Sequence, residues 1–233
     1  MKKYKKYSYN KEYFNTIDTP HKAYIYGLLW ADGYAKGSKL QIELSIKDIE
    51  LINLIYNEIG GLISTRHRMR SRFINDCCSK EFTMVSWYVS SKELVNSLLD
   101  NGFRQTSHLI NKQFINAFLL GFFDGDGSII ITKNNTVQVS FSGSKNANWN
   151  WFYNAVNRIG TFCFTEHKNI NKTGVTSGSH VRIFGKEAIR FLNLLQVDNL
   201  GLNRKKNKLS TAVLLYKTKR NSSVRRITNR IVL

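Results

Sequence analysis

Two short segments of the chain end alike, in an aspartate followed by a glycine. Residues 23–34 read AYIYGLLWADGY and residues 117–128 read AFLLGFFDGDGS, so that Asp32 and Asp126 align without a gap. If the two segments lie together in the folded protein, two carboxylates meet, and like charges at close range repel one another. A divalent cation would relieve this repulsion, and carboxylate oxygens are ligands that suit Mg²⁺ or Mn²⁺. The pair therefore predicts a metal site made by both segments.

The composition indicates what such a metal site acts on. The net charge is +19 over 233 residues, and a basic globular protein commonly binds nucleic acid, with an anionic membrane surface as the alternative. The sequence has no run of about 18 apolar residues, so we expect no membrane span and no membrane partner. Metal ions that contact the attacking and leaving oxygens are an established route to phosphodiester hydrolysis. The charge and the paired acids together predict a nuclease.

The elements that must position the acids are two buried helices. Each segment is almost wholly apolar before its aspartate, which is typical of a helix that is buried on all sides. Small residues lie four apart in each segment, at Gly27 and Ala31 and at Gly121 and Gly125, and so share one helix face. Small residues at this spacing let two helix backbones approach closely. We therefore expect the helices to pack on each other and to bring both acids to the same end.

The same order of elements follows each helix. Alternating apolar residues predict strands, and longer apolar periods that stop at glycine predict helices. In the first half we expect a strand at 40–46, a helix at 48–59, strands at 62–74 and 82–90, and a helix at 92–99. In the second half we expect strands at 128–133 and 136–141, a helix at 146–159, strands at 161–168 and 175–184, and a helix at 186–195. This order predicts an α+β fold of two αββαββα halves.

The two repeated segments resemble a known motif. Residues 25–33 (IYGLLWADG) and 119–127 (LLGFFDGDG) look like two copies of the LAGLIDADG motif, and the chain is similar to the single-chain LAGLIDADG homing endonucleases over residues 21–215. The resemblance implies pseudo-symmetric halves whose antiparallel sheets form a DNA-binding saddle, with the motif helices at the central interface. It also implies a metal-dependent enzyme that makes staggered cuts across the minor groove of a long asymmetric target.

The resemblance assigns the metal ligands by motif position. The eighth position of each copy, Asp32 or Asp126, is the acid that binds the cation, and the carbonyls of Ala31 and Gly125 assist. The sixth position departs from the pattern in one copy only, where Trp30 stands in place of an acid. Because that position is not the metal ligand, the implied activity is unaffected.

The resemblance also predicts a cation near each acid. In the family a basic residue, often lysine, lies in the loop after the third helix of each half. In the second half Lys205 or Lys206 fits this catalytic role, whereas the matching place in the first half holds Thr106 or Ser107. The nearest cation there is Arg104. We therefore expect the two DNA strands to be cut at unequal rates.

The strands predict a DNA-binding surface independently of the family. Four arginines alternate along one predicted strand and so project from one face, where phosphates or guanine edges would supply counter-charge; a solvated basic face is the alternative. Polar residues on the other strands are further candidates. The candidate DNA-binding residues are Gln41, Glu43, Ser45, Arg66, Arg68, Arg70, Arg72, Lys133, Gln138, Ser140, His167, Lys168 and Arg182.

The chain divides into two half-domains with basic ends. We expect an N-terminal arm at 1–20, the first half at 21–107, the second half at 108–217 and a C-terminal tail at 218–233. Each basic end either follows the DNA backbone or serves only as solubilising charge. The three cysteines form no CxxC pair, which indicates a reducing intracellular compartment without structural zinc or a disulfide framework. We expect a monomer.

These features predict a site-specific homing endonuclease that cuts double-stranded DNA, for intron homing, with Mg²⁺ or Mn²⁺. Two alternatives share the scaffold: an RNA-binding intron maturase and a catalytically silent DNA-binding regulator. The silent regulator is disfavoured because both acids remain. For the motif helices alone, the alternative is an ordinary buried helix pair whose acids only cap the helix ends.

Overall fold

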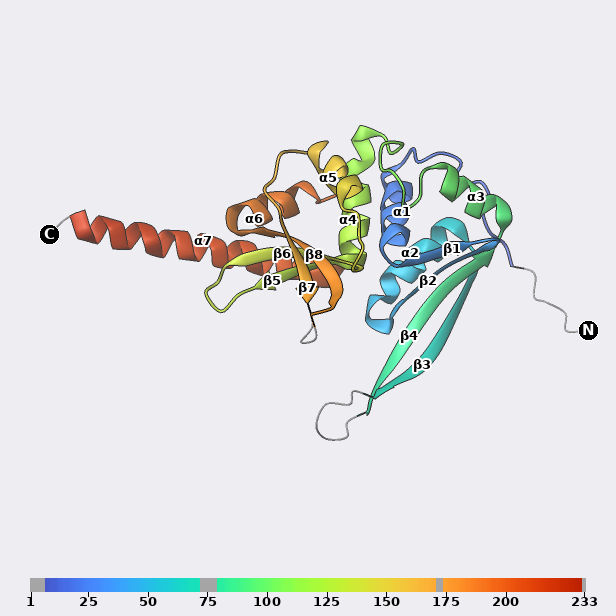
Figure 1. The fold of residues 1–233 in the computed structure, drawn as a ribbon, viewed down its shortest axis with the longest axis horizontal. Coiled ribbons are helices and arrows are strands. Elements are labelled where there is room, and N and C mark those ends of the chain that lie inside the picture. The colour runs from blue at the N-terminus through green and yellow to red at the C-terminus, as the bar shows by residue number, and fades with distance from the viewer. Residues whose placement is uncertain (1–6, 72–78, 171–173, 232–233) are drawn as a thin grey trace, which may run out of the picture.

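Two adjacent helices lie at the centre of the molecule, α1 (Pro20–Asp32) and α4 (Ile115–Asp126) (Figure 1). The computed structural model describes residues 7–71, 79–170 and 174–231. Helix α1 begins at Pro20 because the Thr19 side chain accepts a hydrogen bond from the amide of Lys22 and because proline suits the first turn. Both helices end in a glycine with extended backbone, which turns the chain into the next strand.

The two helices touch backbone to backbone through the predicted glycines. A Cβ atom at Gly27 would overlap the carbonyl oxygen of Phe118, and one at Gly121 would overlap that of Tyr24. The contact is thus the same in both directions, as the repeat predicts. The expected packing of the two motif helices is confirmed, and with it the reason for glycine at these positions.

The first half carries a sheet with helices on one face. Its elements are β1 (Gly33–Lys36), β2 (Lys39–Ser45), the 3-10 turn η1 (Ile46–Asp48), α2 (Ile49–Ile59), β3 (Leu62–Ser71), β4 (Ser79–Ser90) and α3 (Lys92–Asp100). The strands pair antiparallel in the order β1-β2-β4-β3. Along β2 the apolar residues are buried against the helices, and the polar residues between them face the other side.

The second half repeats this arrangement. Its elements are η2 (Lys112–Phe114), β5 (Gly127–Ile131), β6 (Val137–Gly143), α5 (Asn150–Asn157), β7 (Thr165–Ile170), β8 (Thr176–Phe184), α6 (Gly185–Leu194) and α7 (Asn203–Ile231). The strand order, β5-β6-β8-β7, matches that of the first half. The register matches as well, since Gly33 lies opposite Ile42 in one sheet and Gly127 lies opposite Phe141 in the other. The predicted α+β fold with two αββαββα halves is confirmed.

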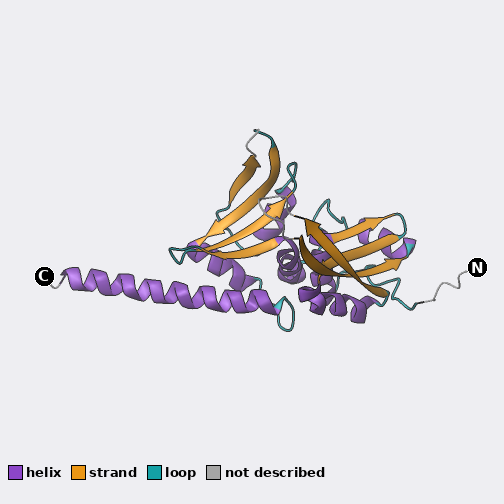
Figure 2. Cartoon of the chain, turned by 90° about the horizontal axis from the view of Figure 1, so that it is seen from below, coloured by secondary structure: helices purple, strands orange, loops and turns teal. Residues whose placement is uncertain are grey.

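Both sheets lie on the same side of the motif helices. In Figure 1 the β3–β4 and β7–β8 hairpins project downward, and Figure 2, seen from below, shows strands of both sheets in front of the central helices. The acid-bearing ends of α1 and α4 lead directly into β1 and β5. The carboxylates therefore lie between the two sheets, which is the place a ligand lying across both sheets would reach.

Some elements differ from those the sequence predicts. Strand β1 has only four residues, too few for an alternating pattern to be recognised. Residues 161–164, which we expected to begin a strand, carry no strand structure, and β7 starts at Thr165. Within the predicted N-terminal arm, Tyr13 and Phe14 are buried in the core of the first half. The predicted C-terminal tail continues α7, which extends well beyond the body (Figure 1).

Candidate metal centre and nucleic-acid interface

The two repeated acids meet at the junction of the halves. Asp32 is the last residue of α1 and Asp126 is the last residue of α4. The Asp32 carboxylate lies against the other helix, because a Cβ atom built on Gly125 would be 2.9 Å from its Oδ2. A larger residue than glycine at position 125 would displace this carboxylate. The structure thus brings together the acids that the repeat aligned.

The surroundings of the acids disfavour their charged forms. Burial, and then the negative charge of Asp32, raises the pKa of Asp126 to about 6, although Arg104 and Lys205 act in the opposite direction. Burial also raises the pKa of Asp32, even though this residue keeps an exposed outer surface. Two carboxylates with raised pKa values therefore lie next to each other at helix C-termini, and the nearby Arg104 and Lys205 relieve their repulsion only in part.

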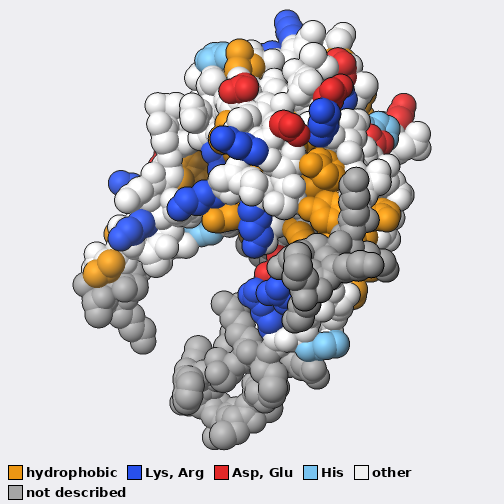
Figure 3. All heavy atoms as spheres, turned by 90° about the vertical axis from the view of Figure 1, so that its right-hand side faces the viewer, with side chains coloured by type: hydrophobic (Ala, Val, Ile, Leu, Met, Phe, Trp, Pro, Cys, Tyr) orange, Lys and Arg blue, Asp and Glu red, His pale blue; other side chains and the backbone are white. Residues whose placement is uncertain are grey.

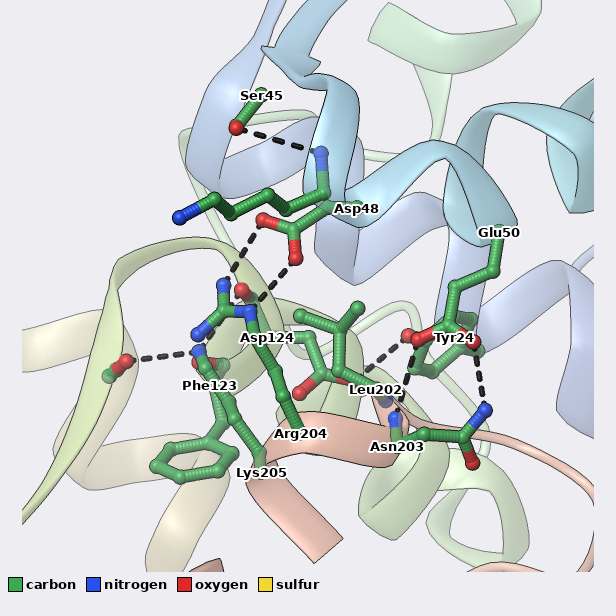
Figure 4. A network of polar contacts seen from close by, with 12 residues as sticks. Tyr24, Ser45, Asp48, Glu50, Phe123, Asp124, Leu202, Asn203, Arg204 and Lys205 are labelled. Carbon is green, nitrogen blue, oxygen red and sulfur yellow. Dashed lines mark hydrogen bonds and ion pairs between the residues drawn. The ribbon is translucent and has the colours of Figure 1, made fainter.

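One of the two predicted lysines reaches this site. Lys205 is only 7% exposed, and its Nζ donates to the carbonyl oxygens of Asp124 (2.8 Å), Gly127 (2.7 Å) and Phe123. These carbonyls belong to the end of α4, so the ammonium group caps the helix that carries Asp126 (Figure 4). Burial lowers the pKa of Lys205 to about 8. Of the two predicted lysines, Lys205 is therefore the one whose ammonium group lies at the acid-bearing end of α4, whereas the side chain of Lys206 is partly exposed.

Arg104 takes the matching place in the first half. Its guanidinium donates to the carbonyl oxygens of Trp30 (2.8 Å), Ala31 (2.9 Å) and Gly33 (2.8 Å), at the end of α1. By loop position the sequence matched Thr106 or Ser107 to this place, with Arg104 as the nearest cation. The path of the loop, with Arg104 at a φ of 58°, brings the arginine itself to the helix end. The sequence signal was weak, since the two loops do not align residue by residue.

The donors at the junction fit a hard divalent cation. Two carboxylates from different halves converge there, and backbone carbonyls and water would complete an oxygen shell. Within residues 7–71, 79–170 and 174–231 no group of three or more His, Cys, Asp or Glu side chains could hold a metal, so a cation here would depend on both acids. Of the two carbonyls expected to assist, that of Ala31 already accepts from Arg104. None of the three Lys205 hydrogen bonds uses the Gly125 carbonyl.

A cavity of about 540 Å³ opens beside Asp126. Asp126 and Arg104 lie on its wall together with Trp30 and Trp151, whose ring centroids are 4.9 Å apart. Serine and asparagine side chains between β6 and α5 form much of the remaining wall. Asp126 is therefore open to a ligand from this side.

The saddle face of the first half carries the expected polar residues. Gln41, Glu43 and Ser45 face away from the helices on β2. On β3, Arg66 and Arg68 are exposed, and Arg68 reaches Glu43 in an ion pair of 2.7 Å. Arg70 lies in β3 but its side chain is outside the described part of the chain, and Arg72 lies wholly outside it.

The second half presents fewer of its candidates. Gln138 and Ser140 are 9% and 4% exposed, so they offer little surface to a ligand. His167 lies opposite His180 in the β7–β8 pair, but Lys168 lies opposite the buried Ser179. Consecutive strand residues point to opposite faces, so Lys168, which is exposed, does not share the face of His167. DNA contact by either residue stays a prediction.

The two remaining candidates keep the expected positions. Lys133 is exposed in the turn between β5 and β6, and Arg182 is partly buried on β8. Figure 3 shows Lys and Arg side chains gathered along the hollowed lower side of the molecule. A cationic concave surface of this kind suits a polyanion. Among the described helices, none is long and apolar enough to cross a membrane.

Comparisons with known proteins agree with the motif. Residues 113–195 match the model of the LAGLIDADG-like domain. The structure resembles the homing endonuclease I-WcaI bound to its DNA recognition sequence, with a TM-score of 0.53 and 16% identity over 85% of this chain and 91% of that one. The chain therefore carries a LAGLIDADG-like domain and has the LAGLIDADG fold, as the sequence predicts.

Two further structures are more distant. A variant of I-DmoI in complex with target DNA nicked in the coding strand, in the presence of 2 mM Mn, gives a TM-score of 0.47 at 17% identity, over 82% of this chain and 99% of that one. The N-terminal LAGLIDADG domain of DUF199/WhiA gives 0.49 at 12% identity, over 85% and 93%. No curated protein sequence matches the chain significantly.

Proposed function

We propose, since the chain carries a LAGLIDADG-like domain, that it is a site-specific endonuclease that cuts both strands of a long, asymmetric DNA target. The observation that supports this most is the meeting of Asp32 and Asp126 at the junction of two sheets. The fold is also that of I-WcaI, which is described as bound to its DNA recognition sequence. Both copies of the motif keep the acid, which favours an enzyme over a silent scaffold.

The two acids would hold one or more Mg²⁺ or Mn²⁺ ions. A bound cation there supplies charge stabilisation to the scissile phosphate and lowers the pKa of a water molecule. Asp32 and Asp126 would hold the cation together, so that each half would contribute to the same centre. Lys205 and Arg104 lie beside them and add positive charge where a phosphate would build up negative charge.

The saddle residues would bind the DNA on either side of this centre. Arg66 and Arg68 on β3 suit phosphates or guanine edges, and Gln41 suits an adenine edge. The basic surface in Figure 3 supplies the salt-dependent part of the affinity. An endonuclease of this kind has a homing role if its target is the host DNA sequence without the inserted element that carries the enzyme's gene.

A cleavage assay on selected DNA tests this proposal. Duplexes that the wild-type protein cuts with Mg²⁺ are recovered from a randomised library and then assayed under single-turnover conditions. We expect Asp32→Asn and Asp126→Asn to lower the rate by at least about 100-fold, because each removes a metal ligand that the other cannot replace. The matched control is Asp18→Asn, an exposed acid that pairs with Lys22 far from the junction.

Each outcome has a clear meaning. Equal cleavage by wild type and Asp126→Asn would contradict the proposed role of the acids. Tight binding of a selected duplex without cutting would indicate a silent DNA-binding regulator. Binding to structured RNA in place of duplex DNA would indicate a maturase.

A further inference from the structure

The first turn of α7 crosses from the second half to the first (Figure 4). The backbone amide of Asn203 donates to Glu50 (3.1 Å), and its side-chain amide donates to the same carboxylate (2.6 Å). The Arg204 guanidinium makes two hydrogen bonds to Asp48, of 2.6 and 2.9 Å. Two parallel hydrogen bonds of this kind fix both the distance and the orientation of the pair. The start of α7 is thus attached to η1 and α2 of the opposite half.

The residue that follows these contacts is Lys205. On its other side, the amide of Leu202 donates to Asp124 (2.8 Å), which also accepts from Tyr24 of the first half (2.6 Å). The turn that presents Lys205 is therefore held from both halves. A long lysine side chain has many rotamers, so its ammonium group stays at the end of α4 only if the backbone beneath it is fixed.

The equivalent loop of the first half is held in the same crosswise manner. Arg158, at the end of α5, donates to the carbonyl oxygens of Ser107 (2.9 Å) and Ile110. The Ser107 hydroxyl donates to the carbonyl of Trp151 (3.1 Å). Ser107 ends the first half three positions after Arg104, so the second half fixes the C-terminal end of the segment that carries the cation of the first.

We propose that each half positions the site cation of the other: Asp48 of the first half positions Lys205, and Arg158 of the second half positions Arg104. The inference rests on the proposed endonuclease function for its effect on cutting, but its structural part stands without it. Asp48 and Arg158 are positioning residues, since neither contacts the acids. The two halves would then be coupled at the reaction centre, beyond the shared helix interface.

The reactivity of Lys205 towards a labelling reagent tests, without any DNA, whether Asp48 positions Lys205. Acetic anhydride labels accessible lysines, and mass spectrometry gives the rate at each site. We expect Lys205 to be protected in the wild type and several-fold more reactive in Asp48→Asn, with protection restored in Asp48→Glu. The control Glu187→Gln, which breaks the exposed pair with Arg190, leaves Lys205 protected. Continued protection of Lys205 in Asp48→Asn would overturn the proposal.

Strand-specific nicking of DNA tests both the role of Asp48 towards Lys205 and the role of Arg158 towards Arg104. On a selected duplex labelled on each strand, Lys205→Met and Arg104→Met first define which strand depends on which cation. We expect Asp48→Asn to slow the Lys205-dependent strand at least about fivefold, and Arg158→Gln to slow the Arg104-dependent strand similarly, each with little effect on the other strand. A general loss of folding would slow both strands alike, and that result contradicts the positioning roles.

A double mutant gives the sharpest comparison. Because Asp48 acts through Lys205, Asp48→Asn combined with Lys205→Met is expected to cut no more slowly than Lys205→Met alone. Additive slowing would overturn the proposal. If the wild type cuts no selected duplex, the endonuclease function fails, while the labelling experiment still decides whether Asp48 positions Lys205.

Discussion

At the scale of single residues, Asp32 and Asp126 are two neighbouring carboxylates whose charged forms are disfavoured by burial. Burial and the neighbouring Asp32 raise the pKa of Asp126 to about 6. The aspartate repeat in the sequence predicts this meeting of acids, because only the alignment of two motif copies is needed to see it. The sequence identifies Arg104 as the nearest cation in the first half, but it could not predict that the arginine reaches the end of α1, since that depends on the shape of its loop.

The raised pKa of Asp126 predicts how stability depends on pH. The folded protein binds this proton more tightly than the unfolded chain, whose aspartate has a pKa of 3.8. The stability contributed by this group is therefore greatest below about pH 4 and falls as the pH rises towards 6. We expect Asp126→Asn, measured at pH 7.5 with EDTA, to be more stable than wild type by on the order of 1 kcal/mol, allowing for solvent screening.

Thermal unfolding followed by circular dichroism measures this change. An increase of a few degrees in Tm corresponds to such a difference. Asp198→Asn, at an exposed loop position, serves as the control and should leave Tm unchanged. Adding Mg²⁺ should stabilise the wild type more than Asp126→Asn. A lower Tm for Asp126→Asn under EDTA would mean that the carboxylate is not in conflict with its surroundings.

At the scale of elements, the close approach of α1 and α4 sets the position of the acids. The sequence predicts this interface well, because small residues recur at the same spacing in both motif copies. It predicts the flanking strands less well. Strand β1 is too short to show a pattern, and a polar face such as that of β6 can still be buried, as Gln138 and Ser140 show.

The interface predicts an unusual effect of alanine in a helix. Replacing glycine by alanine inside a helix normally stabilises it by about 1 kcal/mol. At Gly121 the added methyl group would overlap the Tyr24 carbonyl, so we expect Gly121→Ala to destabilise the protein by about 2 kcal/mol or more. Urea unfolding measures the change, with Asn53→Ala on the exposed face of α2 as the control. Stabilisation by Gly121→Ala would exclude the close helix contact.

At the scale of the whole molecule, the two halves share a fold but differ in chemistry. Arg104 donates hydrogen bonds to carbonyls at the end of α1, whereas Lys205, with a pKa of about 8, donates to carbonyls at the end of α4. Unequal strand rates stay a prediction, which now depends on Arg104 and Lys205, both of which the sequence offered as cations near the acids. The crosswise contacts of Asp48 and Arg158 could not be predicted, since they join segments far apart in the sequence whose side chains carry no motif.

We propose one cation-binding site, shared by the two halves, where α1 and α4 end. Fe²⁺ can replace Mg²⁺ at such sites, and with ascorbate and peroxide it cleaves the protein backbone close to where it is bound. We expect cleavage of the wild type near Asp32 and near Asp126 together, suppressed by excess Mg²⁺ and lost in Asp32→Asn and Asp126→Asn. Cleavage at other positions, or a pattern unchanged by either substitution, would contradict a metal centre shared by the two halves.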